Sequence, residues 1–485
     1  MSPNVPLVAW MPDADLTQPG VLADVYNMLP TSRGYAAEFT LSEAIESTVA
    51  GGLEARCYGA ARLNFSTFTP ILVAGTTNKL FACYGNSYND VSGATYTPIT
   101  DPQEAWRFDA FGDTALAVSA QNALQYTDDV YSTDFAAVSG APKAATMCVQ
   151  SNFVLLANTQ YNGATHAYGD GWWCSALGDY SDWSPDLATQ CDRGRLLQTP
   201  GEIIRLIAFR NEVIAFKRHS MLRGVWVNRP AQGTIWQWSV ISTTVGIVGH
   251  DAVCDAGGVL YWIAEDGFYR YAGGGVERIA NAPWRWWQAN SSDNIVWRTY
   301  TQAAWDPVWR CVRWWYVPYQ QYTTELTGGL ALHVDSGRWG RFEADIEWVA
   351  PTYYQYVRTP SLPDDVTIQR GALVVFESSD HKPMTWTEEP AESWFVTGDF
   401  GDDDQVTTLT GTRVRWATAP DTTVGLHTYR MALGSALTTG AEVAPGGDGI
   451  YPFTQAARWH RVTFTQTGWC ELLGVSVESP KQGRK

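Results

Sequence analysis

Charged residues are scarce in this chain, and the shortage is greatest on the basic side. Only 17% of the 485 residues are charged, below the roughly 25% of typical globular proteins. The 33 basic residues face 50 acidic ones, so the net charge is −17. Because binding to exposed nucleic acid or anionic lipid depends on Lys and Arg, this balance argues against both partners. It is compatible with DNA that must slide past without binding.

The sequence also lacks the features of membrane, exported and disulfide-linked proteins. It has no apolar run of the roughly 18 residues that a membrane span needs. Met1–Leu7 has neither the basic start nor the apolar core of a signal peptide, so we expect assembly in a cytoplasm. The eight cysteines include no Cys-x-x-Cys pair, and several, such as Cys83 and Cys148, lie in apolar strand-like runs. We predict buried thiols rather than a disulfide framework.

The motifs of the common catalytic and cofactor sites are missing as well. There is no P-loop, zinc-protease, nucleophile-elbow or paired-cysteine motif. The seven histidines are scattered, and none has a partner at the i+2 or i+4 spacing that zinc sites use. We therefore expect no catalytic residue, no cofactor and no metal, and we predict that the chain is not an enzyme.

Aromatic residues and glycine are abundant. The chain contains 24 Trp, 23 Tyr, 17 Phe and 43 Gly, and 45% of its residues are hydrophobic. Aromatic side chains favour pleated sheet, and glycine supplies the positive-φ positions of tight turns. The composition predicts an all-β protein with a substantial core.

A hairpin pattern recurs from about residue 65 onward. A short apolar strand is followed by a polar or Gly turn and a second strand rich in aromatics, as in Val259–Ile263, Glu265–Gly267 and Phe268–Tyr271. The repeat is irregular, at roughly 40 to 60 residues, which overlaps the spacing of propeller blades. Radial stacking buries the faces that one hairpin leaves exposed. We predict a β-propeller-like domain over residues 56–390, with six blades preferred and seven as the alternative; an array of β-sandwiches is the competing interpretation.

Different patterns flank this domain. Residues 1–55 hold five prolines and indicate an extended arm that packs on its own domain or on a neighbouring subunit. Residues 391–485 contain short alternating strands, such as Arg413–Trp416 and Leu472–Val477, between Gly- and Asp-rich turns. They predict a β-sandwich-like module that ends in a short basic tail, Lys481–Lys485.

Two groups of acidic residues are candidates for function. Glu343, Asp345 and Glu347 alternate with apolar residues, so a strand would place their carboxylates on one side at a spacing that glycosidases use. A solvated strand face is the simpler interpretation. The turn Asp399–Asp404 has the oxygen ligands of a hard-cation site, but it lacks the spacing of a calcium loop, and an exposed turn accounts for it.

Clusters of tryptophan form the third group. Aromatic residues and Arg are enriched in protein–protein contacts, so these clusters are candidate subunit-interface residues. Packing in the core and stacking on sugars are the other interpretations. The candidate interface residues are Trp172, Trp173, Trp183, Trp284, Arg285, Trp286, Trp287, Trp314 and Trp315.

Four stretches, in this order along the chain, give it a resemblance to a known family. They are Asn27–Tyr35, Gly201–Phe216 with Leu222–Trp226, Val245–Val253 with Tyr261–Gly267, and Arg458–Val462 with Glu471–Val477. Together they resemble the tail hub or nozzle proteins of short-tailed bacteriophages, also called packaged-DNA stabilisation proteins. The loops Thr159–Asp192 and Pro318–Gly329 do not match the family.

The resemblance implies a structural virion protein of the tail, assembled in the host cytoplasm. It implies a propeller-based homo-hexameric ring below the portal and adaptor proteins, which extends the DNA channel, retains the packaged genome and allows its ejection. Tail fibres or spikes would attach to the ring, and double-stranded DNA would pass through the lumen without specific binding. It brings no catalytic residue and no cofactor. Two other functions stay open: a carbohydrate-binding or glycan-degrading propeller protein, and a receptor-binding fibre or baseplate component.

Overall fold

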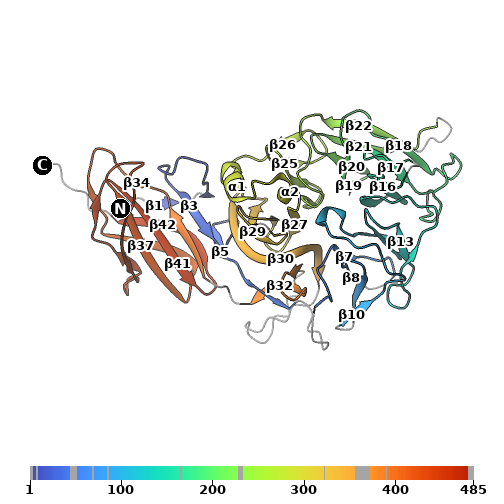
Figure 1. Ribbon diagram of the computed structural model, residues 1–485. Helices are drawn as coiled ribbons and strands as arrows, with labels where there is room; N and C mark the ends of the chain where they lie inside the picture. The colour runs from blue at the N-terminus through green and yellow to red at the C-terminus, as the bar shows by residue number, and fades with distance from the viewer. Residues whose placement is uncertain are drawn as a thin grey trace.

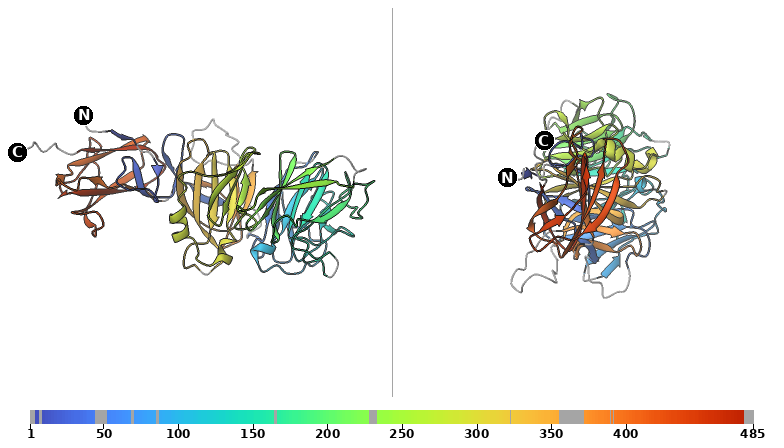
Figure 2. Two further views of the ribbon diagram at one scale, coloured as in Figure 1. Left: turned by 90° about the horizontal axis from the view of Figure 1, so that it is seen from above. Right: turned by 90° about the vertical axis from the view of Figure 1, so that its left-hand side faces the viewer.

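The protein is an elongated all-β molecule, as its composition predicted (Figures 1 and 2). The computed structural model describes residues 4–6, 9–43, 52–67, 70–84, 87–163, 166–227, 233–321, 323–354, 372–388, 390 and 392–478. The helical elements within these residues are a 3-10 turn, η1 (Pro102–Glu104), and two short α-helices, α1 (Trp284–Asn290) and α2 (Ile295–Arg298).

Five antiparallel sheets of four strands follow one another along the chain, and each is a meander of consecutive strands. The predicted hairpin around residue 265 is confirmed as the two central strands of the fifth sheet. The strands are β7 (Ala60–Leu63), β8 (Ile71–Gly75), β9 (Leu80–Tyr84) and β10 (Ser87–Asp90); β11 (Arg107–Phe111), β12 (Thr114–Val118), β13 (Gln125–Thr127) and β14 (Ala136–Ala137); β15 (Thr146–Gln150), β16 (Phe153–Ala157), β17 (Gly171–Cys174) and β18 (Asp192–Arg195); β19 (Ile203–Phe209), β20 (Glu212–Lys217), β21 (Met221–Trp226) and β22 (Trp236–Ser242); and β23 (Val253–Asp255), β24 (Leu260–Ala264), β25 (Gly267–Tyr271) and β26 (Val276–Arg278).

Two further sets of four strands share one long strand, β30 (Trp339–Tyr354). Its first part completes the meander of β27 (Gln302–Asp306), β28 (Cys311–Tyr316) and β29 (Leu326–His333). Beyond a register shift between Ile346 and Trp348 it pairs with β31 (Ala372–Glu377), which pairs with β32 (Pro383–Glu388). The fourth strand of this last set is β6 (Thr40–Glu43), which precedes all the other sets in the sequence. The last set is thus completed by an early segment of the chain.

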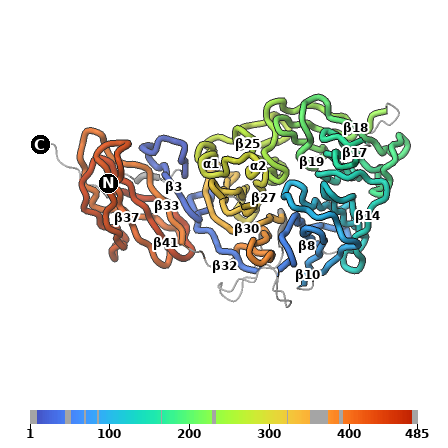
Figure 3. The backbone as a smooth tube through the Cα atoms, in the orientation of Figure 1, coloured from blue at the N-terminus to red at the C-terminus, as the bar shows by residue number. Residues whose placement is uncertain are grey.

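The first strands of successive sets lie next to one another. β7 contacts β11 and β30, β11 contacts β15, β15 contacts β19, β23 contacts β27, and β27 contacts β30. Figure 3 shows the sets arranged one after another around a common centre. The first strands are therefore the inner strands of this body, and the fourth strands lie outside.

The remaining strands form two sheets that pack face to face. Phe395 and Phe464 of one sheet contact Trp416 and Tyr451 of the other, with ring centroids 6.2 and 4.9 Å apart. The first sheet contains β2 (Ala9–Trp10), β3 (Val21–Tyr26), β33 (Ser393–Thr397), β41 (Trp459–Thr467), β37 (Thr422–Arg430) and β38 (Thr438–Val443), with β34 (Phe400–Gly401) beside β41. The second contains β4 (Met28–Pro30), β5 (Tyr35–Ala37), β42 (Glu471–Glu478), β36 (Gly411–Thr418) and β39 (Ile450–Pro452), with β1 (Asn4–Pro6) beside β42, and it is continuous with β27–β30 because β4 pairs with β30. β35 (Thr407–Thr408) and β40 (Ala456–Ala457) form a separate pair.

The N-terminal segment 9–43 belongs to both bodies. Strands β2 and β3 extend the first sheet of the sandwich, β5 pairs with β42 in the second, and β6 completes the last set around β30. A buried ion pair holds the segment in place just before β6. Arg313 of β28 contacts Glu38 at 2.5 Å, and it contacts Asp306 at 2.7 Å. The segment predicted as an extended arm, residues 1–55, is extended in its described part, and it is built into the sheets.

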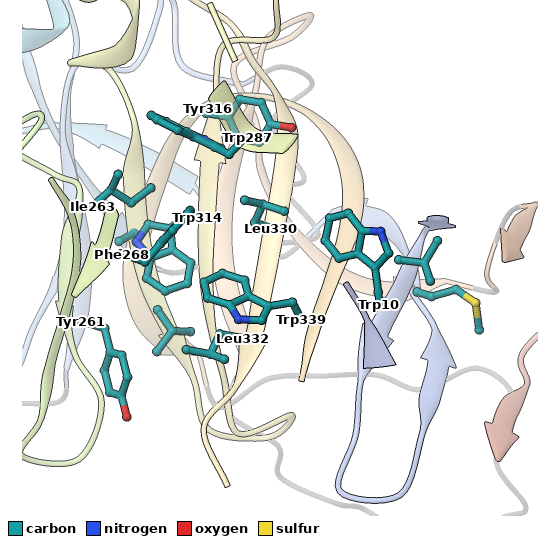
Figure 4. Close-up of a cluster of buried hydrophobic side chains, with 14 of the residues drawn as sticks. Trp10, Tyr261, Ile263, Phe268, Trp287, Trp314, Tyr316, Leu330, Leu332 and Trp339 are labelled. Atoms are coloured by element: carbon teal, nitrogen blue, oxygen red, sulfur yellow. The ribbon is translucent and has the colours of Figure 1, made fainter. Parts of the chain in front are cut away.

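Aromatic side chains fill the space between the sheet of β23–β26 and the strands β28–β30 (Figure 4). Phe268 of β25 lies edge-on to Trp314 and Trp339, with ring centroids 5.3 and 4.8 Å away, and these two indoles stack on each other at 5.5 Å. Trp10 of β2 reaches toward the same cluster from the N-terminal segment. All eight cysteines are buried free thiols, as predicted.

Glu347 joins the first set of strands to the last. Its Oε1 accepts a hydrogen bond from the Cys57 backbone amide (2.7 Å), just before β7, and its Oε2 lies 2.8 Å from His381 Nδ1, between β31 and β32. The prediction of a shared face is therefore wrong for this residue. Glu343 and Asp345 are exposed, whereas the register shift at 346–348 turns Glu347 inward, where it is 2% exposed.

Glu347 should make the stability of the fold depend on pH. Burial raises its pKa to about 8, so near neutral pH the carboxylic acid donates to His381 and accepts from Cys57. The folded-state pKa lies above the unfolded value of 4.5, so this stabilisation is complete below pH 4.5 and is lost as the pH rises through 8. Glu347→Gln keeps both hydrogen bonds without a titrating proton, and Glu347→Ala loses both at a cost of about 2 kcal/mol.

Urea unfolding of the wild type and both variants between pH 5 and 8.5 tests this expectation. The free energy of unfolding of Glu347→Gln should fall less with rising pH than that of the wild type. Equal slopes for the two proteins would show that Glu347 is not the titrating group.

Candidate functional site

A cavity lies where the inner strands converge, and it is the candidate functional site of this body. Its volume is about 370 Å³. All seven inner segments contribute to its lining: β7, β11, β15, β19, β23, β27 and the second part of β30, through Ala60, Arg107, Met147, Arg205, Val253, Gln302 and Val349 among others. Side chains that point inward from different sheets can therefore meet here.

Charged residues from different sheets do meet in this cavity. Arg107 Nη1 of β11 donates to both carboxylate oxygens of Asp251, at 2.8 and 3.0 Å, and Arg205 of β19 lies 3.6 Å from the same carboxylate. Asp251 lies two residues before β23, and its backbone carbonyl accepts a hydrogen bond from the Ala303 amide of β27. One residue thus connects four sheets.

His250 extends the network to β15. Its Nδ1 lies 2.9 Å from Asp251 Oδ1 and its Nε2 lies 3.1 Å from Thr146 Oγ1, which also accepts the Leu206 amide at 2.9 Å. Burial lowers the pKa of His250 to about 3, and the charge of Arg107 adds to this effect. The ring is therefore neutral, and its nitrogens lie within hydrogen-bond distance of Asp251, Thr146 and the Arg205 guanidinium.

The pKa values of Asp251 and Asp109, both half-buried, are shifted in opposite directions. Burial alone would raise the pKa of Asp251, but Arg107 and its other neighbours hold that pKa well below its usual range, so it is a carboxylate. Burial raises the pKa of Asp109 to about 6, in spite of hydrogen bonds from the Val149 and Ala110 amides. The charges of the cavity are thus largely paired with one another.

These hydrogen bonds and ion pairs hold the inner strands in fixed relative positions. Thr146, His250 and Asp251 are residue types that an acyl-transfer relay could use, but the Thr146 side chain is fully buried and its oxygen already accepts a hydrogen bond from the Leu206 amide. A substrate cannot reach it. Sequence motifs did not identify this cluster, because its residues come from different four-stranded sets. The signal that the sequence did contain was the presence of charged residues, such as Arg107 and Arg205, on otherwise apolar inner strands.

The described residues contain no group of three or more His, Cys, Asp and Glu side chains arranged to hold a metal ion. In the turn Asp399–Asp404, the Asp399 carboxylate forms ion pairs with Arg430 and Arg461. Asp403 accepts a hydrogen bond from the Trp459 indole at 2.8 Å. Two of the acidic side chains of this turn therefore serve the sandwich itself.

Five of the nine candidate interface residues are buried within this chain. Trp314 and Trp287 belong to the cluster in Figure 4, and Trp315 packs on Phe342 at 5.5 Å. Trp172 of β17 and Trp183, in the loop between β17 and β18, are each 4% exposed. These five offer almost no surface to another subunit.

The other four candidates are at least partly accessible. Trp173 is half-buried beneath the Arg193 guanidinium, 4.9 Å from its ring. Trp284 and Trp286 of α1 are half-buried, and Arg285 is exposed. Asp13 accepts hydrogen bonds from the backbone amides of Arg285 (2.6 Å) and Trp286 (2.9 Å), so α1 also holds the N-terminal segment against the body of four-stranded sets. The interface prediction can rest only on these four.

The chain was compared with protein-family models and with curated proteins. No family model matches it, and no curated protein matches it. Within the described residues, no helix has both the length and the apolar character needed to cross a bilayer.

Removing the shared carboxylate should destabilise the fold. Asp251→Asn leaves the Arg107 charge, 5% exposed, without a full counter-charge, and we expect a loss of about 3 kcal/mol in the free energy of unfolding. Combining it with Arg107→Met removes the stranded charge and should recover part of that loss. Guanidinium unfolding of the two single variants and the double variant measures the coupling between the residues.

A solvent-exposed ion pair provides the matched control. Arg310 and Asp335 pair on the surface, with side chains 56% and 51% exposed, so Asp335→Asn should change stability little. Similar losses for Asp251→Asn and Asp335→Asn, or strict additivity in the double variant, would contradict the role given to the central network.

Proposed function

We propose that this chain is a structural subunit of a bacteriophage tail, forming a nozzle or hub ring that extends the portal channel. The ring would retain packaged DNA and open for its ejection, beneath portal and adaptor proteins and above fibres or spikes. The subunit acts mechanically, and no reaction is assigned to it.

The fold proposed for its main body is a seven-bladed propeller, the alternative to the preferred count of six. Supporting it, one cavity is lined by seven inner segments from seven sets of four strands. In the seventh set, an early strand, β6, pairs with late strands, β31 and β32, which is how a circular array of sheets avoids an open seam. Glu347 bonds across the same seam.

The observation that carries the functional proposal is where the family-like stretches fall in the fold. Asn27–Tyr35 forms the β4–β5 hairpin that bridges the two bodies, and Val245–Val253 leads through His250 and Asp251 into the central network. Arg458–Val462 and Glu471–Val477 lie in β41 and β42, one in each sheet of the sandwich. These stretches thus lie at joints that hold the architecture together, as expected for a protein whose role is its shape, whereas Gly201–Phe216 with Leu222–Trp226 forms β19–β21 of the fourth sheet.

The charge supports a conduit rather than a binder. The net charge is −17 per chain, and some of the bases, such as Arg107, Arg313 and Arg461, are held in ion pairs within the molecule, which makes them less available for phosphate contacts. DNA moving through a ring of such subunits would find no strongly attractive site.

Electron microscopy and native mass spectrometry of the purified full-length chain test the proposal. We expect six-fold rings with a central hole, at six times the monomer mass. At physiological ionic strength, a short duplex DNA should not be retained by these rings, and lowering the salt should not produce tight binding.

Other assemblies would replace this proposal with one of its alternatives. Monomers that bind or cleave glycans would establish the carbohydrate-active function. A trimer that adheres to host cells would favour the receptor-binding fibre or baseplate component.

A further inference from the structure

Most outer strands of the four-stranded sets are protected against pairing with another chain. Short length and charge are the usual protections of an exposed strand edge, and both occur here. β14 has two residues and β26 has three, including Glu277 and Arg278. β18 contains Asp192, Arg193 and Arg195, β10 ends at Asp90, which pairs with Lys79, and β6 ends at Glu43, which pairs with Lys382.

The outer strand β22 has neither protection. It spans seven residues, Trp236–Ser242, and no charged residue occurs between positions 233 and 249. Its Val240 side chain is 37% exposed, and Gln237 and Ser239 are exposed beside it. It is the last strand of its sheet, and no described residue pairs with its outer side. A register shift affects only its end, near Ser242.

The hydrogen-bond pattern shows which backbone groups β22 presents. Val227 N donates to Ile235 O at the hairpin end of the β21–β22 pair. Because bonded and non-bonded pairs alternate along an antiparallel ladder, Gln237 and Ser239 bond inward to β21. The backbone groups of Trp236 and Trp238 therefore point outward, ready to bond another strand.

The sandwich ends in a second open strand of similar length. β38 spans six residues, Thr438–Val443, closes the order of its sheet, and carries one charge, Glu442. The turn that leads into it exposes three large apolar side chains: Met431 at 52%, Leu433 at 41% and Leu437 at 36%. Exposed apolar residues beside an open edge are typical of an interaction surface.

The two open strands lie in different bodies of the elongated molecule. Figure 1 shows β22 at the upper edge of the body of four-stranded sets and β37, the partner of β38, in the sandwich. Contacts between two different surfaces are heterologous, and a repeated heterologous contact generates a ring when its rotation closes.

We propose that β22 of one copy pairs with β38 of the next copy, joining successive subunits through a continuous sheet. This contact rests on the proposed function, because a ring requires self-association. It adds which two surfaces of neighbouring copies meet. Pairing of β22 with itself about a two-fold axis would leave β38 and its apolar turn uncovered, and it would not build a closed ring by itself.

Lysine substitutions on the two strands test the contact in the full-length chain. Ser239→Lys with Val240→Lys places charge on β22, and Thr439→Lys with Ala441→Lys places charge on β38. Each double variant should weaken association on the order of 100-fold or more, as loss of a central interface contact does. The matched control is Ala136→Lys with Ala137→Lys on β14, whose residues are also exposed on an outer strand; it should assemble normally.

Mixing the two variants provides the sharper test. Each retains one intact strand, so an equimolar mixture should form a one-to-one heterodimer in native mass spectrometry while each variant alone stays monomeric. Circular dichroism melting curves like that of the wild type establish that both variants are folded.

The possible outcomes separate this contact from the proposed function. If the wild type forms rings and either folded variant also forms rings, the strand pairing is overturned while the proposed ring stands. Normal assembly of the β38 variant alone indicates a two-fold β22 contact and also overturns it. A wild type that stays monomeric at every concentration contradicts the ring, and the contact with it.

Discussion

The fold depends on one early segment of the chain being hydrogen-bonded into two bodies at once. Residues 9–43 supply edge and inner strands to the sandwich and then the last strand of the set around β31 and β32. Pairing these edges satisfies backbone groups that would otherwise be open to solvent or to other chains. The same segment carries Glu38 to Arg313 and Asp13 to the first turn of α1, so it is fixed by charge as well as by the sheet ladder.

Several basic residues of this acidic chain form ion pairs inside it. Arg107 and Arg205 share Asp251 at the centre of the inner strands, Arg313 lies between two carboxylates, and Arg430 and Arg461 share Asp399 in the sandwich. The Asp251 pairs join different sheets, whereas Arg313 and Asp306 lie on neighbouring strands of one sheet, and Asp399, between β33 and β34, pairs with two strands of its own sheet. Buried charges of this kind add little net stability over apolar packing, but they penalise any arrangement that separates the partners. They therefore help to specify how the sheets are arranged, while the surface keeps its negative charge.

Local patterns predicted part of this structure. The excess of aromatics and Gly predicted the all-β class, and the Val259–Tyr271 pattern predicted β24 and β25, because hairpins are encoded by neighbouring residues. Pairings between distant segments were not encoded this way: nothing near Thr40–Glu43 indicates β32 as its partner. The central network was missed for the same reason, and Glu347 was misplaced because a register shift reverses the alternation that a regular strand would have.

The direct test of this account is to cut the chain between β6 and β7 and ask whether the N-terminal piece stays bound. A specific protease site inserted between residues 44 and 51 allows cleavage of the folded protein. If the segment is built into both bodies, the fragment will co-elute with the rest of the chain in gel filtration and separate only in denaturant. Release of the fragment under native conditions, with the remainder still folded, would contradict the account.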